Sequence, residues 1–242
     1  SDVCSSDLAL NTPPERASAK VFLKTLGDSL GASKNASDML IPTLDLSALF
    51  PDAASSYIEK HGGKVHLGVH VRALTHSNHQ WQITGDGFDE CFDKIILAVP
   101  AYAAQTLIAP LNTALSESLN FDYEPITTCY LKYNASVRLS APFFALKENT
   151  SSGQWGQFVF DRGQLDPTQS GLLAVVISAS TDAIALGQSA LVQAISLQLA
   201  EALQRTELAS PEWSWLVTEK RATFACTPNL RRPTNETLLK HL

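Results

Sequence analysis

The 242-residue chain lacks the short motifs that identify many catalytic sites. It has no GxSxG nucleophile turn, no P-loop and no HExxH zinc motif. His66 and His70 are four residues apart, but a metal site would need a third ligand and ordered partners for the imidazole rings. We interpret both histidines as surface residues of a strand, and we predict no metal site.

An excess of positive charge and a long apolar run are also missing. The 18 Lys and Arg residues are outnumbered by 24 Asp and Glu residues, so the formal net charge is −6. A nucleic-acid partner normally requires a basic surface, so we predict no such partner. The most apolar window, residues 95–104, is too short for a membrane span and is interrupted by Pro100. Peripheral contact with a membrane stays open.

Cysteine is scarce and unpatterned. The four cysteines show neither a CxxC pair nor a His/Cys ligand spacing; they are Cys4, Cys91, Cys129 and Cys226. Free, mostly buried thiols are typical of a reducing compartment. We therefore expect a cytoplasmic protein.

The two ends of the chain carry little structural signal. Residues 1–8, SDVCSSDL, have no periodicity and lack the basic start and apolar stretch of a signal peptide. We interpret them as a non-native tail and leave them out of the fold prediction. Residues 237–242 read as the start of an apolar element, so we expect residues 226–242 to lead into a following segment.

The composition that is present suits a folded core, with 45% hydrophobic and 17% charged residues. Thr12 with Glu15 three residues later resembles a capping box, so we predict a helix from there to about Leu30. We predict a short helix over residues 45–50. A further helix over residues 52–61 should end at the glycine pair that follows it.

Residues 62–100 are the central stretch of the chain. Alternating apolar and polar residues predict short strands within residues 65–71, 80–84 and 88–92. Residues 95–99 are apolar on both faces, so we predict a buried, parallel strand that Pro100 ends. A helix should begin at Tyr102.

The rest of the chain alternates strands and helices. Strands are predicted within residues 121–133 and over residues 154–160, 172–178 and 213–224. An apolar stripe over residues 182–205 predicts the longest helix. The order of elements indicates an α/β protein.

Three places could carry chemistry, and each has an ordinary structural alternative. Asp161 and Arg162, at the end of a strand, could orient a polar group, or form a solvated turn or ion pair. Tyr123 could donate a proton near a cleft, or pack at an edge. Trp155, Phe158 and Phe160 could line an apolar tunnel, since strand parity places the two phenylalanines on one face, or could belong to the core.

The central stretch resembles the middle segment of the flavin amine oxidase and phytoene desaturase superfamily. The shared features are a Gly-Gly turn, a short strand that ends in Val, a hairpin and a strand that ends Ala-Val-Pro. In that superfamily the first strand lays its backbone beside the adenine of FAD, and the Ala-Val-Pro turn approaches the flavin. The resemblance assigns these roles to Val71 and to Ala98, Val99 and Pro100.

Four further segments are similar to the squalene-associated FAD-dependent desaturases, whose members are hydroxysqualene dehydroxylases of bacterial hopanoid synthesis. These segments are LNTPPERAS (10–18), DLSALFP (45–51), YEPITT (123–128) and EKRATF (219–224). The family's GxGxxG fingerprint and its carboxy-terminal Gly-Asp segment are absent from the sequence. We therefore expect a fragment that is incomplete as an FAD cradle.

The resemblance implies a truncated two-domain flavoprotein. Residues 62–100 would belong to the FAD-binding domain, and residues 9–61 and 101–225 largely to the substrate domain. FAD is the implied cofactor and hydroxysqualene, a C30 isoprenoid, the implied substrate, which favours contact with the inner membrane. The electron donor is unknown, and Tyr123 and Asp161 are the candidates for the catalytic acid.

The implied reaction is reductive removal of the hydroxyl of hydroxysqualene, which leaves as water. Three alternatives stay open. The chain could belong to a related amine oxidase or carotenoid desaturase. It could also be a binding module that holds an isoprenoid without flavin, or a fragment without a stable fold.

Overall fold

The computed structural model describes residues 10–29, 31, 33, 35, 38 and 40–233. The predictions for the tail at residues 1–8, for Cys4 and for residues 237–242 lie outside these residues. Within them the chain divides into two compact units. The first unit contains the described residues up to Leu49 together with Tyr123–Asn229, and the second contains Phe50–Asp122 and the residues after Asn229. These boundaries differ from the segments that we expected, because residues 50–61 and 101–122 group with the central stretch.

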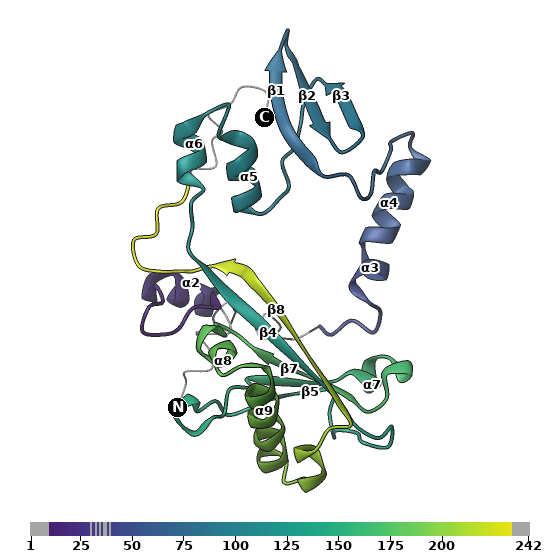
Figure 1. The fold of residues 1–242 in the computed structure, drawn as a ribbon, viewed down its shortest axis with the longest axis vertical. Helices are drawn as coiled ribbons and strands as arrows, with labels where there is room; N and C mark the ends of the chain where they lie inside the picture. The colour runs from purple at the N-terminus through teal and green to yellow at the C-terminus, as the bar shows by residue number, and fades with distance from the viewer. Residues whose placement is uncertain are drawn as a thin grey trace. The chain divides into compact units, whose positions relative to one another are not determined.

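The first unit is built on a five-stranded antiparallel sheet with the order β5-β6-β7-β4-β8 (Figure 1). Its strands are β4 (Tyr123–Lys132), β5 (Phe143–Ala145), β6 (Phe158–Asp161), β7 (Leu172–Ile177) and β8 (Trp213–Phe224). The strands predicted at residues 121–133, 172–178 and 213–224 are confirmed. The strand predicted from Gln154 begins only at Phe158, because Gln154 forms an isolated bridge with Asn149.

The two faces of this sheet differ. Cys129, Leu131, Leu173, Val175 and Val159 point to one face and are buried. Helix α9 (Gln188–Ala202) covers that face and buries its own apolar stripe there, Leu191, Ile195 and Leu199 (Figure 1). Alternation along the strands places Tyr130, Phe158, Phe160, Trp213 and Trp215 on the opposite face.

The helix predicted over residues 182–205 is divided in the structure. Helix α8 (Thr181–Ala185) ends before Gly187, which has a φ of 84°, and α9 begins at Gln188. A left-handed residue cannot continue an α-helix, so the apolar stripe continues across a break that periodicity does not reveal. The remaining short helices of this unit are α3 (Leu46–Leu49), α7 (Arg162–Leu165) and the 3₁₀ turns Thr150–Ser152, Pro167–Gln169 and Thr206–Ala209.

The predicted helix start at Thr12 is wrong. Helix α2 spans Ala19–Ser29, and Thr12 is fully buried upstream of it. The Thr12 hydroxyl accepts a hydrogen bond from the backbone N–H of Cys226 at 2.9 Å and donates to the carbonyl of Leu10 at 3.0 Å. A tertiary hydrogen bond to a residue more than two hundred positions away therefore replaces the local cap.

The second unit combines helices with a three-stranded antiparallel sheet. Helix α4 (Pro51–Lys60) confirms the predicted helix, and the sheet has the order β1-β2-β3. The strands and remaining helices are β1 (Val71–Ser77), β2 (Gln80–Gly85), β3 (Phe88–Phe92), α5 (Ala101–Ile108) and α6 (Thr113–Ser118). A small core holds this unit together through Leu74, Trp81, Ile95 and Leu107.

The buried parallel strand predicted over residues 95–99 does not form. Ile95 is buried, but Ile96 is 94% exposed and no strand pairs with this segment within the described residues. The strand predicted within residues 65–71 begins only at Val71; residues 65–70 form no strand and bend at Gly68. A β-strand is stable only where a neighbouring strand forms hydrogen bonds with its backbone groups, so apolar composition alone is not sufficient.

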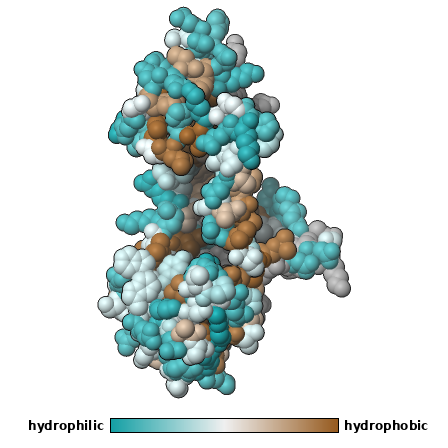
Figure 2. Space-filling view, turned by 90° about the vertical axis from the view of Figure 1, so that its right-hand side faces the viewer, coloured by the Kyte–Doolittle hydropathy of each residue, from teal (hydrophilic) through white to brown (hydrophobic). Residues whose placement is uncertain are grey.

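Figure 2 shows several hydrophobic areas, in brown, at the surface of one face.

Candidate functional site

Val71 begins strand β1, which is an edge strand of the small sheet. Within the described part of the chain, β1 pairs only with β2, so the backbone groups along its other side are free of sheet partners. The pairing shifts register between Val71 and Ala73. Gly85 lies opposite Val71, and a Cβ there would come within 2.5 Å of the carbonyl oxygen of His70. The backbone at Val71 is therefore closely packed against β2 on one side and has no strand partner on the other within the described residues.

The Ala98–Pro100 segment forms a fixed turn before helix α5. The carbonyl of Pro100 accepts hydrogen bonds from Ala103 at 2.9 Å and Ala104 at 3.0 Å, which starts the helix. Ala98 and Val99 are exposed. Leu97 and Val71 pack against the same small core, so the two segments expected beside FAD belong to one cluster.

These features fit a flat, polar-edged cofactor. A free strand edge offers backbone N–H and C=O groups, which are the groups that read an adenine edge without a polar side chain. A small residue followed by proline lets the backbone approach a ring closely and fixes the direction of the chain. Val71, Ala98, Val99 and Pro100 thus have suitable geometry for FAD, although their contacts with it stay a prediction.

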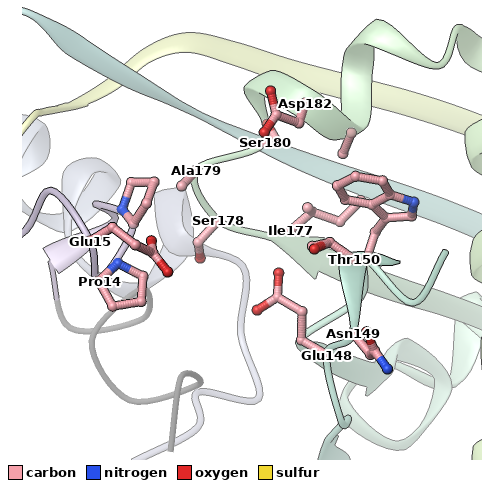
Figure 3. Close-up of a pocket in the computed structure, with 13 residues that line it drawn as sticks. Pro14, Glu15, Glu148, Asn149, Thr150, Ile177, Ser178, Ala179, Ser180 and Asp182 are labelled. Atoms are coloured by element: carbon pink, nitrogen blue, oxygen red, sulfur yellow. The ribbon is translucent and has the colours of Figure 1, made fainter. Parts of the chain in front are cut away.

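The first unit contains a polar cavity of about 380 Å³ beside the end of β7. Figure 3 shows Glu15 and Glu148 directing their carboxylates into it from opposite sides, with Ser178 between them. Asp182, Ser180 and the indole of Trp155 also line it. Ala179 in its wall has a φ of 46°, a conformation that costs energy in a residue other than glycine.

Glu148 is the titratable group of this cavity with a shifted pKa. Burial raises the pKa of its carboxyl above the ordinary value, and a hydrogen bond from Gln157 partly opposes this shift. The bond from Gln157 Nε2 to Glu148 Oε2 is 3.1 Å long. Glu148 lies in a polar stretch without periodicity, so no sequence pattern marks it as a candidate. The structure adds it as a candidate proton donor.

Two buried glutamines hold the cavity wall. Gln157 is fully buried, and its Oε1 accepts a hydrogen bond from the N–H of Ser178 at 2.8 Å. Gln198 of α9 accepts from the N–H of Gly156 at 2.7 Å and donates to the carbonyls of Lys147 and Gly156. Both flanks of the segment from Glu148 to Trp155 are therefore fixed to the helix and the sheet.

A larger cavity, of about 780 Å³, lies on the aromatic face of the sheet. Tyr130 and Phe160 line it, and both stand opposite Ala174 of the intervening strand β7. The ring of Phe143 lies against Phe160, with centroids 5.6 Å apart, and against Phe158 at 5.9 Å.

The structure therefore brings together only two of the three aromatic residues that were predicted to line a tunnel. Phe158 and Phe160 share one face of β6, as strand parity predicted. Trp155 precedes the strand, packs against the core on the α9 side and lines the smaller cavity instead. The role of all three residues in holding a substrate stays a prediction.

Asp161 is fully buried at the end of β6. Its oxygens accept hydrogen bonds from the N–H groups of Leu139 and Gly163 and from the Gln164 amide, at 2.9 to 3.1 Å. Arg138 approaches to 3.4 Å. This set of donors accounts for the burial of a charged group, and the proposed role as an acid stays a prediction.

Tyr123 is the first residue of β4, opposite Phe224, and its hydroxyl is enclosed by protein. It is separated from the smaller cavity of Figure 3, which it does not line. Its role as an acid also stays a prediction.

Three of the segments quoted from the sequence meet in one hydrogen-bonded cluster. The Asn11 amide donates to the carbonyl of Glu124 and to the hydroxyl of Thr223, and it accepts from the N–H of Ala179. Arg16 forms an ion pair with the buried carboxylate of Glu124. Residues of 10–18, 123–128 and 219–224 thus lie together at one end of the sheet.

The described residues were also compared with the requirements of a metal site and of a membrane-spanning helix. Among them, no group of three His, Cys, Asp or Glu side chains could hold a metal ion. In the same part of the chain, no helix has the length and apolar character that a membrane crossing requires.

The fold is mixed α/β, and the solved structures that it resembles include amine-oxidase-like oxidoreductases. An oxidoreductase from Methanosarcina mazei has 14% identity and a TM-score of 0.60, covering 97% of this chain and 56% of that one. A triple mutant of putrescine oxidase has 15% identity and a TM-score of 0.58, covering 88% and 48%. At these identities the likeness shows the fold alone.

The sequence comparison gives the family. The profile described as "Flavin containing amine oxidoreductase" matches residues 18–228, so the chain belongs to this family, and FAD is the cofactor that the family supports. The hydroxysqualene dehydroxylase of Zymomonas mobilis subsp. mobilis is 28% identical over 237 residues, which are 93% of this chain and 50% of that protein. The chain thus spans about half the length of the curated relative that it matches.

Proposed function

We propose that the chain is part of a flavin-dependent oxidoreductase that removes the hydroxyl group of hydroxysqualene and gives squalene. The observation that carries this proposal is the likeness to hydroxysqualene dehydroxylase along 93% of the chain. The large cavity over an aromatic sheet face supports it, since an isoprenoid needs an apolar wall.

FAD would be held through the backbone at Val71 and through the Ala98–Pro100 turn. When bound, the flavin supplies the two electrons and the hydrogen that replace the hydroxyl group. The chain's own part is to orient the two ligands and to keep water away from them. The smaller sheet, with its free edge, supports this assignment.

The leaving hydroxyl needs a proton in order to depart as water. Tyr123 and Asp161 are the candidates from the sequence, and Glu148 is the candidate from the structure. Burial raises the pKa of the Glu148 carboxyl, but Glu148 lines the smaller cavity, so it is a candidate only for a hydroxyl group that enters that cavity and not for one in the larger cavity. A carboxyl with a raised pKa holds its proton to a higher pH than an ordinary carboxyl does, which suits an acid.

The deciding experiment is product analysis on the protein as its gene encodes it, supplied with FAD, a reductant and hydroxysqualene. Formation of squalene is the expected result. A visible flavin absorption band without squalene, together with oxidation of an amine or introduction of double bonds, would support a related flavoenzyme. Isoprenoid binding without a flavin band would support a binding module.

One observation favours amine oxidation as the second candidate. The cavity in Figure 3 is lined by three carboxylates, from Glu15, Glu148 and Asp182, and carboxylates suit an ammonium group. The raised pKa of Glu148 works against this reading, because burial disfavours the charged carboxylate that would attract a cation. Hydrogen peroxide formed from a diamine or polyamine would support it.

A further inference from the structure

Arg162 is held in one orientation at the wall of the larger cavity. It follows the buried Asp161, is itself half-buried, and lines the cavity. Its Nε donates a hydrogen bond to the side-chain oxygen of Gln169 at 3.1 Å. The amide of Gln169 in turn donates to Asp166 at 2.8 Å. A chain of two hydrogen bonds therefore fixes the plane of the guanidinium.

Within the described residues, the outer end of this guanidinium makes no hydrogen bond, although its charge acts on Asp166. In the part of the chain that the structure describes, no hydrogen bond or ion pair engages the two terminal amino groups of Arg162. A guanidinium carries five N–H donors, and the bond to Gln169 uses only the one on Nε. An oriented donor group is therefore left over at the cavity wall.

The lining of the cavity contains both apolar and polar residues. Its apolar lining consists of Tyr130, Phe160, Leu165, Pro167, Ile41, Pro42, Leu44 and Leu46. Its polar lining consists of Arg162, Gln169, Asp166, Asp45 and Thr43. Such a cavity suits a long apolar molecule that carries a single polar group.

The charged residues of the lining are Arg162, Asp45 and Asp166, and the charge of Arg162 acts on Asp166. Asp166 stays ionised, because hydrogen bonds from Thr168 and Gln169 lower the pKa of its carboxyl. Asp45 adds a second carboxylate, so one cation and two anions line the cavity, and the sum is 1 − 2 = −1. A carboxylate ligand would meet this negative charge, whereas a neutral oxygen accepts from Arg162 without opposition.

From this geometry we infer that the cavity binds a long-chain isoprenoid alcohol, whose hydroxyl oxygen accepts a hydrogen bond from Arg162 while its chain lies against Tyr130 and Phe160. Arg162 is then a residue that determines specificity for an alcohol over the corresponding hydrocarbon. The inference rests on the proposed function for the choice of an isoprenoid, and it deepens that function by naming the group that recognises the hydroxyl.

The test is the binding of three C15 probes to the purified chain by equilibrium dialysis: farnesol, farnesoic acid and the hydrocarbon farnesene. Farnesol should bind tightest. Arg162→Met should weaken farnesol binding about tenfold or more, as expected for the loss of a hydrogen bond to a charged donor, and should leave farnesene binding unchanged. Phe160→Ala should weaken both, because both chains contact the aromatic wall.

Arg231→Met is the matched control, since Arg231 is exposed and does not line the cavity. It should leave all three affinities unchanged. Unchanged farnesol binding in Arg162→Met, or tighter binding of farnesoic acid than of farnesol, would overturn the inference. Circular dichroism of each variant checks that it is folded.

A negative result in the binding test and a negative result in the product test overturn different proposals. If farnesol binds through Arg162 but the protein forms no squalene, the inference stands and the proposed reaction is wrong. If squalene forms while Arg162→Met retains full farnesol affinity, the reaction stands and the alcohol is recognised elsewhere.

Discussion

Glu148 and Asp161 are carboxyl groups of the same unit, and their surroundings differ. Asp161 accepts four hydrogen bonds, two of them from backbone N–H groups, whereas the Gln157 amide is the one donor to Glu148 that the structure gives. Burial without enough donors disfavours the charged form of a carboxyl. Both side chains carry a carboxyl group, so only the tertiary fold distinguishes the structural carboxylate of Asp161 from the candidate acid Glu148.

The raised pKa of Glu148 predicts a pH dependence of stability. The folded protein holds this proton more tightly than the unfolded chain, whose pKa is near the ordinary 4.5. The contribution of Glu148 to the free energy of unfolding is therefore fully present at low pH. It is lost as the pH rises from about the unfolded pKa through the folded pKa. Glu148→Gln should remove this loss, because the amide does not ionise.

The measurement is the free energy of unfolding from urea titrations at a series of pH values between about 4 and 8. The difference between wild type and Glu148→Gln should move in favour of the glutamine variant as pH rises. Glu90→Gln, at an exposed position of β3, is the matched control. A difference that does not change with pH would contradict the prediction.

At the scale of elements, the alternation of Trp213, Trp215 and Val217 predicted β8 with the bounds that the structure has. Pro51 and the glycine pair after His61 likewise delimit α4. These elements were predictable because the signals that start and end them are local. Their bounds are therefore reliable from the sequence alone.

The elements that were predicted wrongly depend on distant partners. Thr12 binds Cys226 instead of capping a helix, and the apolar run at residues 95–99 has no strand beside it among the described residues. The same distinction holds for the site. Phe158 and Phe160 followed from strand parity, whereas Trp155 lies where the chain is irregular and points elsewhere.

Gly171, just before β7, is required by the fold of this element. Its φ is +77°, and a Cβ would lie 2.5 Å from the carbonyl oxygens of both Tyr133 and Asn134. Gly171→Ala should therefore destabilise the protein by about 2–4 kcal/mol, through strain and the loss of the bond from Tyr133 N–H to the Gly171 carbonyl.

Gly153→Ala separates the two contributions. Gly153 has a similar φ of +79° but nothing within 4 Å of its added Cβ, so this variant has strain without a clash and should lose only about 1 kcal/mol. Urea unfolding of both variants checks the order. Equal losses would show that the close contact at Gly171 relaxes without cost.

At the scale of the whole molecule, the chain has two separate cores. The larger core lies on the α9 side of the five-stranded sheet and includes Leu131, Leu173 and Leu199. The smaller core includes Leu74 and Trp81 of the second unit. The two clusters share no residue, and each lies within one compact unit. Each unit therefore has its own basis for stability.

Because the two cores are separate, we predict that a destabilising substitution in one unit leaves the amides of the other unit protected from hydrogen exchange. Leu173 is fully buried, so Leu173→Ala should cost about 2–5 kcal/mol in the first unit. Amide hydrogen exchange should then accelerate in β4, β7 and β8, while the amides of β1, β2 and β3 exchange as in the wild type.

Leu74→Ala is the reciprocal variant, because Leu74 is buried in the second core. It should accelerate exchange in β1, β2 and β3 and leave the five-stranded sheet unchanged. If either substitution accelerates exchange in both sheets by the same factor, the two units unfold as one. A ligand that binds the larger cavity should in turn slow exchange only in the first unit, because all the residues that line this cavity belong to it.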